Sequence, residues 1–280
     1  MPRALARLKY PINYPHDVAK LRLEYDTPAP VTVDVDAIRR FEEGRIIYES
    51  PLIDYHSYLK LVQPIVRDGL VAEWLFFEGA GSVLHDTSGY ENHGTIYGMT
   101  WQQLANGKWV GYFDGVDDYV AISKMPDLTG SSFTFEALVK VYSWMKYSVI
   151  MGEGYQSGRD TTALLMTDDT PGKFIFSFFS DDLAFGPLSG VDPRGWIHVT
   201  AVFDADALEQ RGYINAKLVR TRTPHGAPVL QTTTWRIGSG VNTARPFNGL
   251  IALIRIYSRA LSEDEIRELY ELARHVVPLG

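Results

Sequence analysis

The loop at residues 86–94, DTSGYENHG, is the first stretch whose side chains could do chemistry. Its carboxylate, hydroxyl and amide oxygens are the ligands that a hard cation such as calcium prefers. The same residue types also close turns, because Asp86 and Ser88 can accept hydrogen bonds from nearby backbone amides. From the residues alone, a cation site and a capped turn both stay open.

A second acidic group comprises Asp114, Asp117 and Asp118 in the segment FDGVDDYV. Three carboxylates this close together could bind a cation. The Asp-Gly pair, however, is a strong turn signal by itself. We therefore favour a turn between two strands over a metal site here.

Catalytic groups are harder to find. Glu136 could act as an acid, but glycoside hydrolysis needs a second carboxylate roughly 5 to 10 Å away, and no recognisable motif places one. His198 alternates outward beside Thr200 without an evident nucleophile, so a surface histidine is expected. No nucleotide-binding glycine loop, H-E-x-x-H motif or serine elbow occurs. We expect that the protein is not an enzyme.

Several aromatic side chains are predicted to lie in or near loops, where sugar rings could stack on them: Tyr142, Trp144, Tyr147, Tyr155 and Trp235. In a chain that is 12% aromatic, packing in the core or at its rim is the alternative. These residues are candidate ligand-binding positions.

The elements that must position these groups are mainly strands. Residues 133–141 and 197–203 alternate between apolar and mixed faces, and residues 250–257 form an almost unbroken apolar run. Ser262 and Glu265 then form the pattern of a capping box, which predicts a helix directly after that run. Short strands separated by Gly, Pro, Asn and Asp are typical of an antiparallel sandwich.

Six segments in register resemble the laminin-G-like, concanavalin A-like jelly-roll domains: Gly69–Gly98, Tyr112–Ile122, Ser131–Val141, Gly195–Val219, Trp235–Gly240 and Phe247–Tyr270. The resemblance covers about residues 69–270. It implies an all-β antiparallel jelly-roll sandwich at residues 69–280, with a short C-terminal helix. The Glu-x-Asp-x-x-Glu strand of the related glucanases is absent.

In these relatives the loop that matches residues 86–94 often contributes to a calcium site, so Asp86 and Asn92 are candidate ligands. Many relatives have an acidic pair where this chain has Ala252-Leu253, and we expect a weak ion or none. No cofactor is expected to be required. The family's Asn-Gly hairpin turn is Asn215-Ala216 here; alanine tolerates left-handed geometry poorly, so a different turn type is expected.

Residues 1–68 resemble no motif and are interpreted as an arm and a small adaptor region. Residues 1–23 hold five cationic side chains and one anionic side chain, net +4, whereas the whole chain has a net charge of -7. Prolines and apolar residues in 1–30 indicate an extended arm with a partner. A short helix is predicted at 37–43, capped by Asp34 or Asp36, and a strand at Arg45–Tyr48. Residues 51–67 stay open between helix and strand.

Three functional classes follow. The first is a structural component of an assembly, such as a virion capsid, decoration or surface protein, that docks to copies of itself or to other subunits through residues 1–30. The second is a soluble or surface lectin-like module that binds glycan, and the third is a glycoside hydrolase or lyase. Neither a nucleic acid partner nor a membrane span is expected.

The expected location is a virion or another assembled particle. The chain lacks an apolar stretch of signal-peptide length near Met1, so synthesis in the cytoplasm is expected. The absence of cysteine excludes disulfides and thiolate chemistry.

Overall fold

The computed structural model describes residues 4–11, 18–25, 32–42, 45–49, 66–153, 164–178, 181–230, 235–240 and 245–277. The chain divides into two compact units, Met1–Ile65 and Val66–Gly280. This division lies three residues before the boundary expected from the sequence, which follows residue 68. Tyr155 and residues 51–65 lie outside the described residues.

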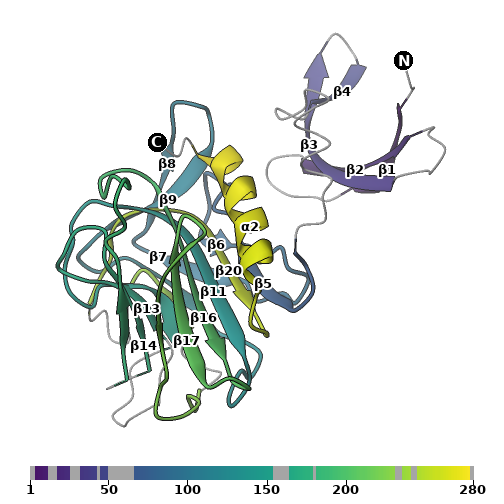
Figure 1. The fold of residues 1–280 in the computed structure, drawn as a ribbon. Coiled ribbons are helices and arrows are strands. Elements are labelled where there is room, and N and C mark those ends of the chain that lie inside the picture. Colours follow the sequence, from purple (N-terminus) through teal and green to yellow (C-terminus); the bar gives the residue numbers. More distant parts are fainter. Residues whose placement is uncertain are drawn as a thin grey trace. The chain divides into compact units, whose positions relative to one another are not determined.

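The first unit contains a four-stranded antiparallel sheet in the order β1-β2-β3-β4 (Figure 1). Its strands are β1 (Ala4–Pro11), β2 (Val18–Tyr25), β3 (Thr32–Glu42) and β4 (Arg45–Glu49). The strand predicted at Arg45–Tyr48 is confirmed, but the helix predicted at 37–43 is wrong. The apolar–polar alternation from Val33 to Ala37 has a period of two, which is typical of a strand and here decides the local structure.

The described part of the predicted arm pairs within its own chain. Strand β1 pairs with β2, and β2 pairs with β3, so the described residues 4–11 and 18–25 are neighbouring antiparallel strands of this sheet. The prediction that these residues form an extended arm docked to a partner is therefore corrected, because they pair within their own sheet. Apolar cross-strand rows such as Leu8–Leu21–Val35 alternate with polar pairs such as Arg22–Asp34. Such alternation is typical of a sheet that buries one face.

The second unit is a sandwich of two antiparallel sheets, as predicted. Sheet I has the order β18-β17-β16-β11-β20-β9-β8, with β5 pairing with β20. Its strands are β5 (Leu70–Trp74), β8 (Thr100–Gln103), β9 (Trp109–Asp114), β11 (Phe133–Val141), β16 (Ile197–Asp204), β17 (Glu209–Ile214), β18 (Lys217–Arg222) and β20 (Asn248–Tyr257).

Sheet II has the order β15-β14-β13-β12-β19-β10-β7-β6. Its strands are β6 (Val83–Leu84), β7 (Gly94–Tyr97), β10 (Tyr119–Ile122), β12 (Val149–Glu153), β13 (Leu164–Thr167), β14 (Phe174–Ser177), β15 (Leu183–Phe185) and β19 (Trp235–Ile237).

The main core lies between the two sheets and is rich in aromatic rings. Phe135 of β11 meets Phe176 of β14 with ring centroids 5.8 Å apart and Trp235 of β19 at 5.7 Å, both edge to face. Phe133 and Phe135 therefore face the core, as the alternation of β11 predicts. Edge-to-face contacts of this kind add to the stabilisation that burial provides.

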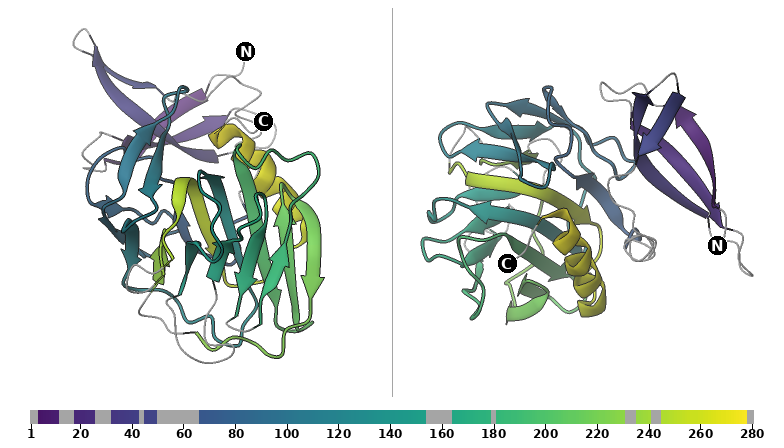
Figure 2. Two further views of the ribbon diagram at one scale, coloured as in Figure 1. Left: turned by 90° about the vertical axis from the view of Figure 1, so that its left-hand side faces the viewer. Right: turned by 90° about the horizontal axis from the view of Figure 1, so that it is seen from above.

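Helix α2 (Glu263–Val276) covers the outer face of sheet I (Figures 1 and 2). The predicted capping box is confirmed: the Ser262 hydroxyl accepts from the Glu265 amide, and the Glu265 carboxylate accepts from the Ser262 amide. Ala273 of this helix belongs to a second apolar cluster, which also includes Leu138 and Leu253 of sheet I. Within the described residues, no helix has the length and apolar character needed to cross a bilayer.

The turn between β17 and β18 differs from the expectation. Both Asn215 and Ala216 are left-handed, with φ angles of 48° and 60°. Positive φ at both central residues is the pattern of a type I′ hairpin turn, which the right-handed twist of the flanking strands favours. The expected change of turn type is therefore wrong, and alanine occupies a position that glycine prefers.

Replacing Ala216 with Gly should raise the free energy of unfolding by about 0.5 kcal/mol, because the relief of left-handed strain exceeds the added entropy of the unfolded chain. Urea denaturation measures this difference. Ala207→Gly is the matched control, since Ala207 lies in the preceding exposed turn and is not left-handed. If both glycine variants are destabilised alike, the strain at Ala216 is not significant.

Candidate functional site

A row of ionisable side chains crosses sheet I beneath α2. Arg255 of β20 lies directly opposite Glu73 of β5 on one side and Glu136 of β11 on the other. Its Nε donates to Glu73 Oε1 at 2.7 Å, and its guanidinium also donates to Glu136 Oε1 at 3.2 Å. His198 Nε2 lies 2.9 Å from the same Glu136 oxygen. All four side chains are at most 5% exposed, so the row is a buried charge network.

The protonation states follow from the opposing charges. Burial alone would raise the pKa of Glu136, but the Arg255 charge and the hydrogen bond with His198 outweigh it and hold that pKa below its ordinary value. Burial likewise opposes charging of Arg255, and its two carboxylate partners raise its pKa, so the guanidinium stays protonated. Glu73 and Glu136 thus both accept hydrogen bonds from the charged Arg255 guanidinium.

This arrangement suits a structural brace better than a catalytic pair. Glycoside hydrolysis needs two carboxylates that reach the substrate, whereas Glu73 and Glu136 contact Arg255 and are shielded from solvent. The prediction that His198 is a surface residue is wrong. Tyr270 of α2 lies over its ring at a centroid distance of 5.6 Å, so the helix buries this face of the sheet.

The loop at 86–94 forms around the Asp86 carboxylate, which is 7% exposed. Its two oxygens accept four hydrogen bonds, from the backbone amides of Glu73, Ser88 and Asn92 and from the Ser88 hydroxyl. The Asn92 side-chain amide donates to the Val71 carbonyl at 2.8 Å. The capped-turn interpretation accounts for these contacts, and Asp86 and Asn92 fasten the loop to β5.

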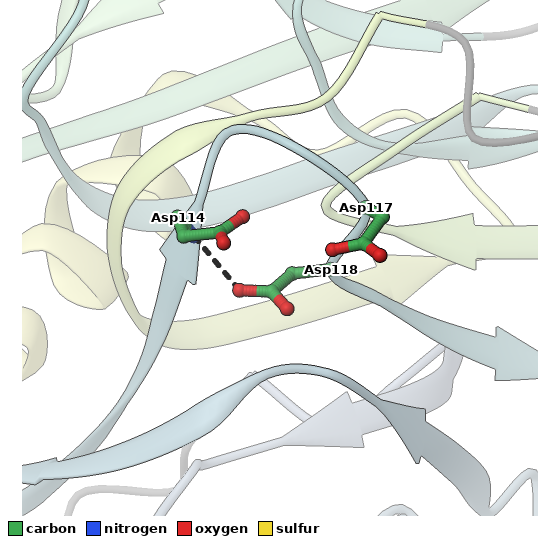
Figure 3. Close-up of side chains that lie close together, drawn as sticks. All are labelled: Asp114, Asp117 and Asp118. Atoms are coloured by element: carbon green, nitrogen blue, oxygen red, sulfur yellow. Dashed lines mark hydrogen bonds between the residues drawn. The ribbon is translucent and has the colours of Figure 1, made fainter.

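The acidic segment after β9 is a turn that joins sheet I to sheet II, and it gathers three carboxylates (Figure 3). Oxygens of Asp114, Asp117 and Asp118 lie within 4.8 Å of one another. Asp118 Oδ2 accepts from the Asp114 amide, and Asp114 Oδ1 accepts from the Val116 amide, both at 2.8 Å. Burial raises the pKa of Asp118, and the neighbouring aspartates add to this effect. A bound hard cation would oppose that increase.

The predicted aromatic candidates do not form one site. Trp235 is 3% exposed and packs in the core, so the packing alternative accounts for it. Trp144 is partly buried and packs edge to face on Phe174 at 5.4 Å. Tyr142 is 48% exposed beside Tyr112.

Tyr147, also considered from the sequence, lies below two cations. The Arg245 guanidinium carbon is 5.0 Å from the ring centroid, and Lys146 Nζ is 5.1 Å from it. These distances are typical of cation–π contacts. Tyr147 also packs against the apolar cluster on sheet II that includes Val149 and Met166.

Sequence analysis missed a pair of stacked tyrosines on strands of sheet II. Tyr97 of β7 lies directly opposite Tyr119 of β10, with ring centroids 4.7 Å apart and planes inclined by 14°. The Arg236 guanidinium lies over the Tyr119 ring at 4.2 Å. Alternation within the strands indicates their shared face, but their pairing depends on a register that the sequence does not show.

Residues 114–267 match the laminin G domain family described as the concanavalin A-like lectin/glucanases superfamily. No curated protein matches the sequence.

Solved structures with a similar fold include domains that bind other molecules. The binding domain of Paraclostridial Mosquitocidal Protein 1 has a TM-score of 0.56 at 16% identity, over 73% of this chain and 52% of that chain. Domain 4 of AbnA, an extracellular arabinanase from Geobacillus stearothermophilus in complex with arabinotriose, has a TM-score of 0.55 at 17% identity. The match covers 72% of this chain and 98% of that domain.

Trypanosoma rangeli sialidase in complex with the inhibitor DANA has a TM-score of 0.54 at 17% identity, over 92% of this chain and 43% of that chain. The chain thus spans about half the length of the mosquitocidal and sialidase chains. At these identities the likeness concerns the fold alone.

Calcium and chelator should give melting temperatures that differ by less than about 5 °C, because amide and hydroxyl donors already occupy the Asp86 oxygens. Asp86→Ala should lower the melting temperature equally in both buffers, since it removes a capping group. A larger calcium shift that disappears in Asp86→Ala would contradict this account. A shift that disappears only in Asp118→Asn would place an ion at the acidic turn.

Replacing Glu136 with Gln should lower the free energy of unfolding at neutral pH by about 3 kcal/mol, because it removes a buried charge from beside Arg255. The folded-state pKa of Glu136 lies below its ordinary value of 4.5, so the wild-type protein loses this contribution as the pH falls below that value. Urea denaturation between pH 6 and pH 3 should therefore show the difference between the two proteins shrinking.

Glu271→Gln is the control, because it breaks an exposed pair with Arg274 on α2 and should cost less than about 1 kcal/mol. If Glu136→Gln costs no more than this control, the buried network does not brace the sandwich.

Proposed function

Because the chain belongs to the concanavalin A-like lectin/glucanases superfamily, we propose that its second unit is a non-enzymatic glycan-binding domain. One observation carries this proposal. The Tyr97 side chain lies at the end of a stack of rings on a sheet face and is 47% exposed to solvent. Tyrosine rings provide a flat apolar surface with a polar edge, which suits the mixed surface of a sugar.

The positions of the acidic groups support a role without catalysis. Glu73 and Glu136 contact Arg255 under α2, where a substrate cannot reach both carboxylates. Asp86 and Asp118 accept hydrogen bonds from the backbone amides of their own loops. The described acidic groups in these clusters therefore serve the fold. The arabinotriose complex of the AbnA domain, which has a similar fold, is consistent with glycan binding.

We propose a second role, in assembly, for the first unit. Its strands lie outside the matched family region, and its register separates apolar from polar rows. A four-stranded sheet with one apolar face gains stability when that face is covered. Docking of this unit to another subunit, as in a virion or other particle, would provide such a cover and leave the second unit available for ligands.

The glycan-binding proposal predicts measurable affinity for at least one oligosaccharide in a panel of neutral and acidic sugars, without release of products. Isothermal titration measures binding, and chromatography of the recovered sugars measures turnover. The proposal would be contradicted if no member of the panel bound. So would turnover that Glu136→Gln abolishes in a variant that stays folded.

The assembly proposal predicts that deleting residues 1–65 leaves a folded second unit that no longer self-associates, because that unit has its own core. Light scattering of the full chain and of the deletion variant measures the change in mass. If both proteins have the same number of subunits, the first unit is not the assembly element.

A further inference from the structure

The last two strands of sheet II, β7 and β6, carry a row of exposed side chains on the outer face of the sheet. Leu84 and Ile96 pack in or against the core, so strand alternation places Val83, Thr95 and Tyr97 on the opposite face. Val83 and Thr95 pair directly, and all three outer side chains are exposed. Within the described residues β6 has no strand on its other side, so a ligand on this row can extend past the sheet.

One face of the Tyr97 ring is free for a ligand. The Tyr119 ring of β10 covers the other face, at a centroid distance of 4.7 Å. Strands β10 and β6 flank β7 on opposite sides. The free face of Tyr97 therefore turns toward β6, away from Tyr119.

Gly81 leaves open space beside that free face. The Ile96 amide donates to the Ser82 carbonyl at 2.8 Å, so the pairing of β6 with β7 continues to Ser82 and brings Gly81 beside Tyr97. A Cβ atom placed on Gly81 would have no atom within 4 Å. The Trp101 indole donates to the Gly81 carbonyl at 3.4 Å and holds this segment in place. A sugar ring can therefore lie over Gly81 and stack on Tyr97.

His93 lies at the other end of the row. A Cβ atom on Gly94 would meet the core side chains Val120 and Ile122, so alternation places His93 on the outer face with Thr95. His93 and Tyr97 are four residues apart, about 13 Å along an extended strand. A monosaccharide spans only part of this distance, whereas an oligosaccharide can contact both ends.

The contacts of His93 define which of its nitrogens a ligand can use. Its Nδ1 accepts from the Asp86 amide at 3.0 Å, so in the neutral ring the proton is on Nε2. The His85 ring packs edge to face against it at 5.3 Å, and Glu78 accepts from the His85 amide at 2.8 Å. These contacts orient the exposed His93 ring, whose Nε2–H can donate to a sugar hydroxyl.

The charges around the row disfavour an anionic ligand. Between residues 78 and 97 the chain has three carboxylates, those of Glu78, Asp86 and Glu91, and no lysine or arginine. The side chains along the row itself, from Val83 to Tyr97, are uncharged apart from the two histidines.

Charged groups from the neighbouring strand do not change this balance. Lys124 follows β10, and the Arg236 guanidinium lies on the Tyr119 ring, which separates it from the free face of Tyr97. Opposite charges come from the turn before β10, where Asp117 is exposed and the Asp118 carboxylate lies beside Gly98. An uncharged ligand fits this surface best.

We infer that this row binds a neutral oligosaccharide along β7, with one sugar ring stacked on the free face of Tyr97 and a hydroxyl of another accepting from His93 Nε2–H. We call the surface the edge strip; it comprises Gly81, Val83, His93, Thr95 and Tyr97. The inference rests on the proposed glycan-binding function and specifies its site and ligand class.

Neutral hexaoses provide the probes: cellohexaose, xylohexaose, mannohexaose, laminarihexaose and arabinohexaose. Isothermal titration should show binding of at least one, and the corresponding monosaccharide should bind about tenfold more weakly or worse, because it cannot reach both ends of the strip. Tetragalacturonate should bind no more tightly than its carboxyl-reduced, neutral form.

Three variants test the two ends. Tyr97→Ala should weaken binding of the hexaose by about 2- to 10-fold through loss of stacking, whereas Tyr97→Phe keeps the ring face and should retain most of the affinity. His93→Asn keeps an acceptor near the position of Nδ1 but lacks Nε2–H, and should weaken binding by about 2- to 10-fold.

Matched controls are Tyr142→Ala and His225→Asn. Tyr142 has an exposure similar to that of Tyr97. His225 is an exposed histidine whose Nδ1 lies 3.1 Å from Asp181, in the connection between β14 and β15 at the opposite end of sheet II. Both controls should leave the affinity unchanged, and thermal melting checks that each variant folds.

The outcomes separate this inference from the proposed function. Hexaose binding that both Tyr97→Ala and His93→Asn leave intact, or that the controls weaken equally, would overturn the edge strip while glycan binding stands. A tenfold preference for tetragalacturonate over its neutral form would overturn the ligand class. If no neutral hexaose binds, the inference fails, whereas the proposed function fails only if the wider panel of neutral and acidic sugars also fails to bind.

Discussion

The second unit depends on the neutralisation of one buried cation. Arg255 lies in the last strand of the sandwich, and its partners are Glu73 from the first strand of the unit and Glu136 from a central strand. A charge without partners in this position would be strongly destabilising, because burial removes its hydration. The three strands must therefore be in register before the cation can be buried. Any pairing of these strands that leaves Arg255 without its two carboxylates is therefore penalised.

Helix α2 completes this constraint by excluding water from the network. Its capping box begins it directly after β20, and its apolar side packs on the outer face of sheet I. The central strands of sheet I, β11, β16 and β20, are thereby packed on both faces. Sheet II also packs on the core, but its outer face offers Tyr97 to solvent. A binding role fits this second face, and the buried carboxylates under the helix serve stability.

Much of the fold could be predicted because its signals are local. The alternation of residues 133–141 and the pair Ser262 and Glu265 follow from strand and helix geometry, and the six matching segments add their order. His198 could not be placed, because alternation separates two faces without saying what covers each. The helix expected at 37–43 failed for a related reason: aspartates are cap residues, but within an alternating strand they also occupy its polar face.

The candidate site was harder to predict than the fold because it depends on contacts between distant residues. The loop chemistry of Asp86 gave two interpretations, and the choice between them required knowing which amides its oxygens accept from. Tyr97 and Tyr119 lie on different strands, and only the register brings their rings together. Trp235 is apolar and aromatic whether it binds a sugar or fills the core, so composition alone could not decide its position.

We infer that the buried charge network supports the fold and takes no part in ligand recognition. The most direct test is to replace the network as a whole with apolar residues, in the variant Glu73→Leu, Glu136→Leu, His198→Leu and Arg255→Met, which leaves no buried charge unpaired. The expected result is a folded protein with a stability close to that of the wild type and an unchanged glycan affinity by titration calorimetry. A folded variant that no longer binds glycan would contradict it.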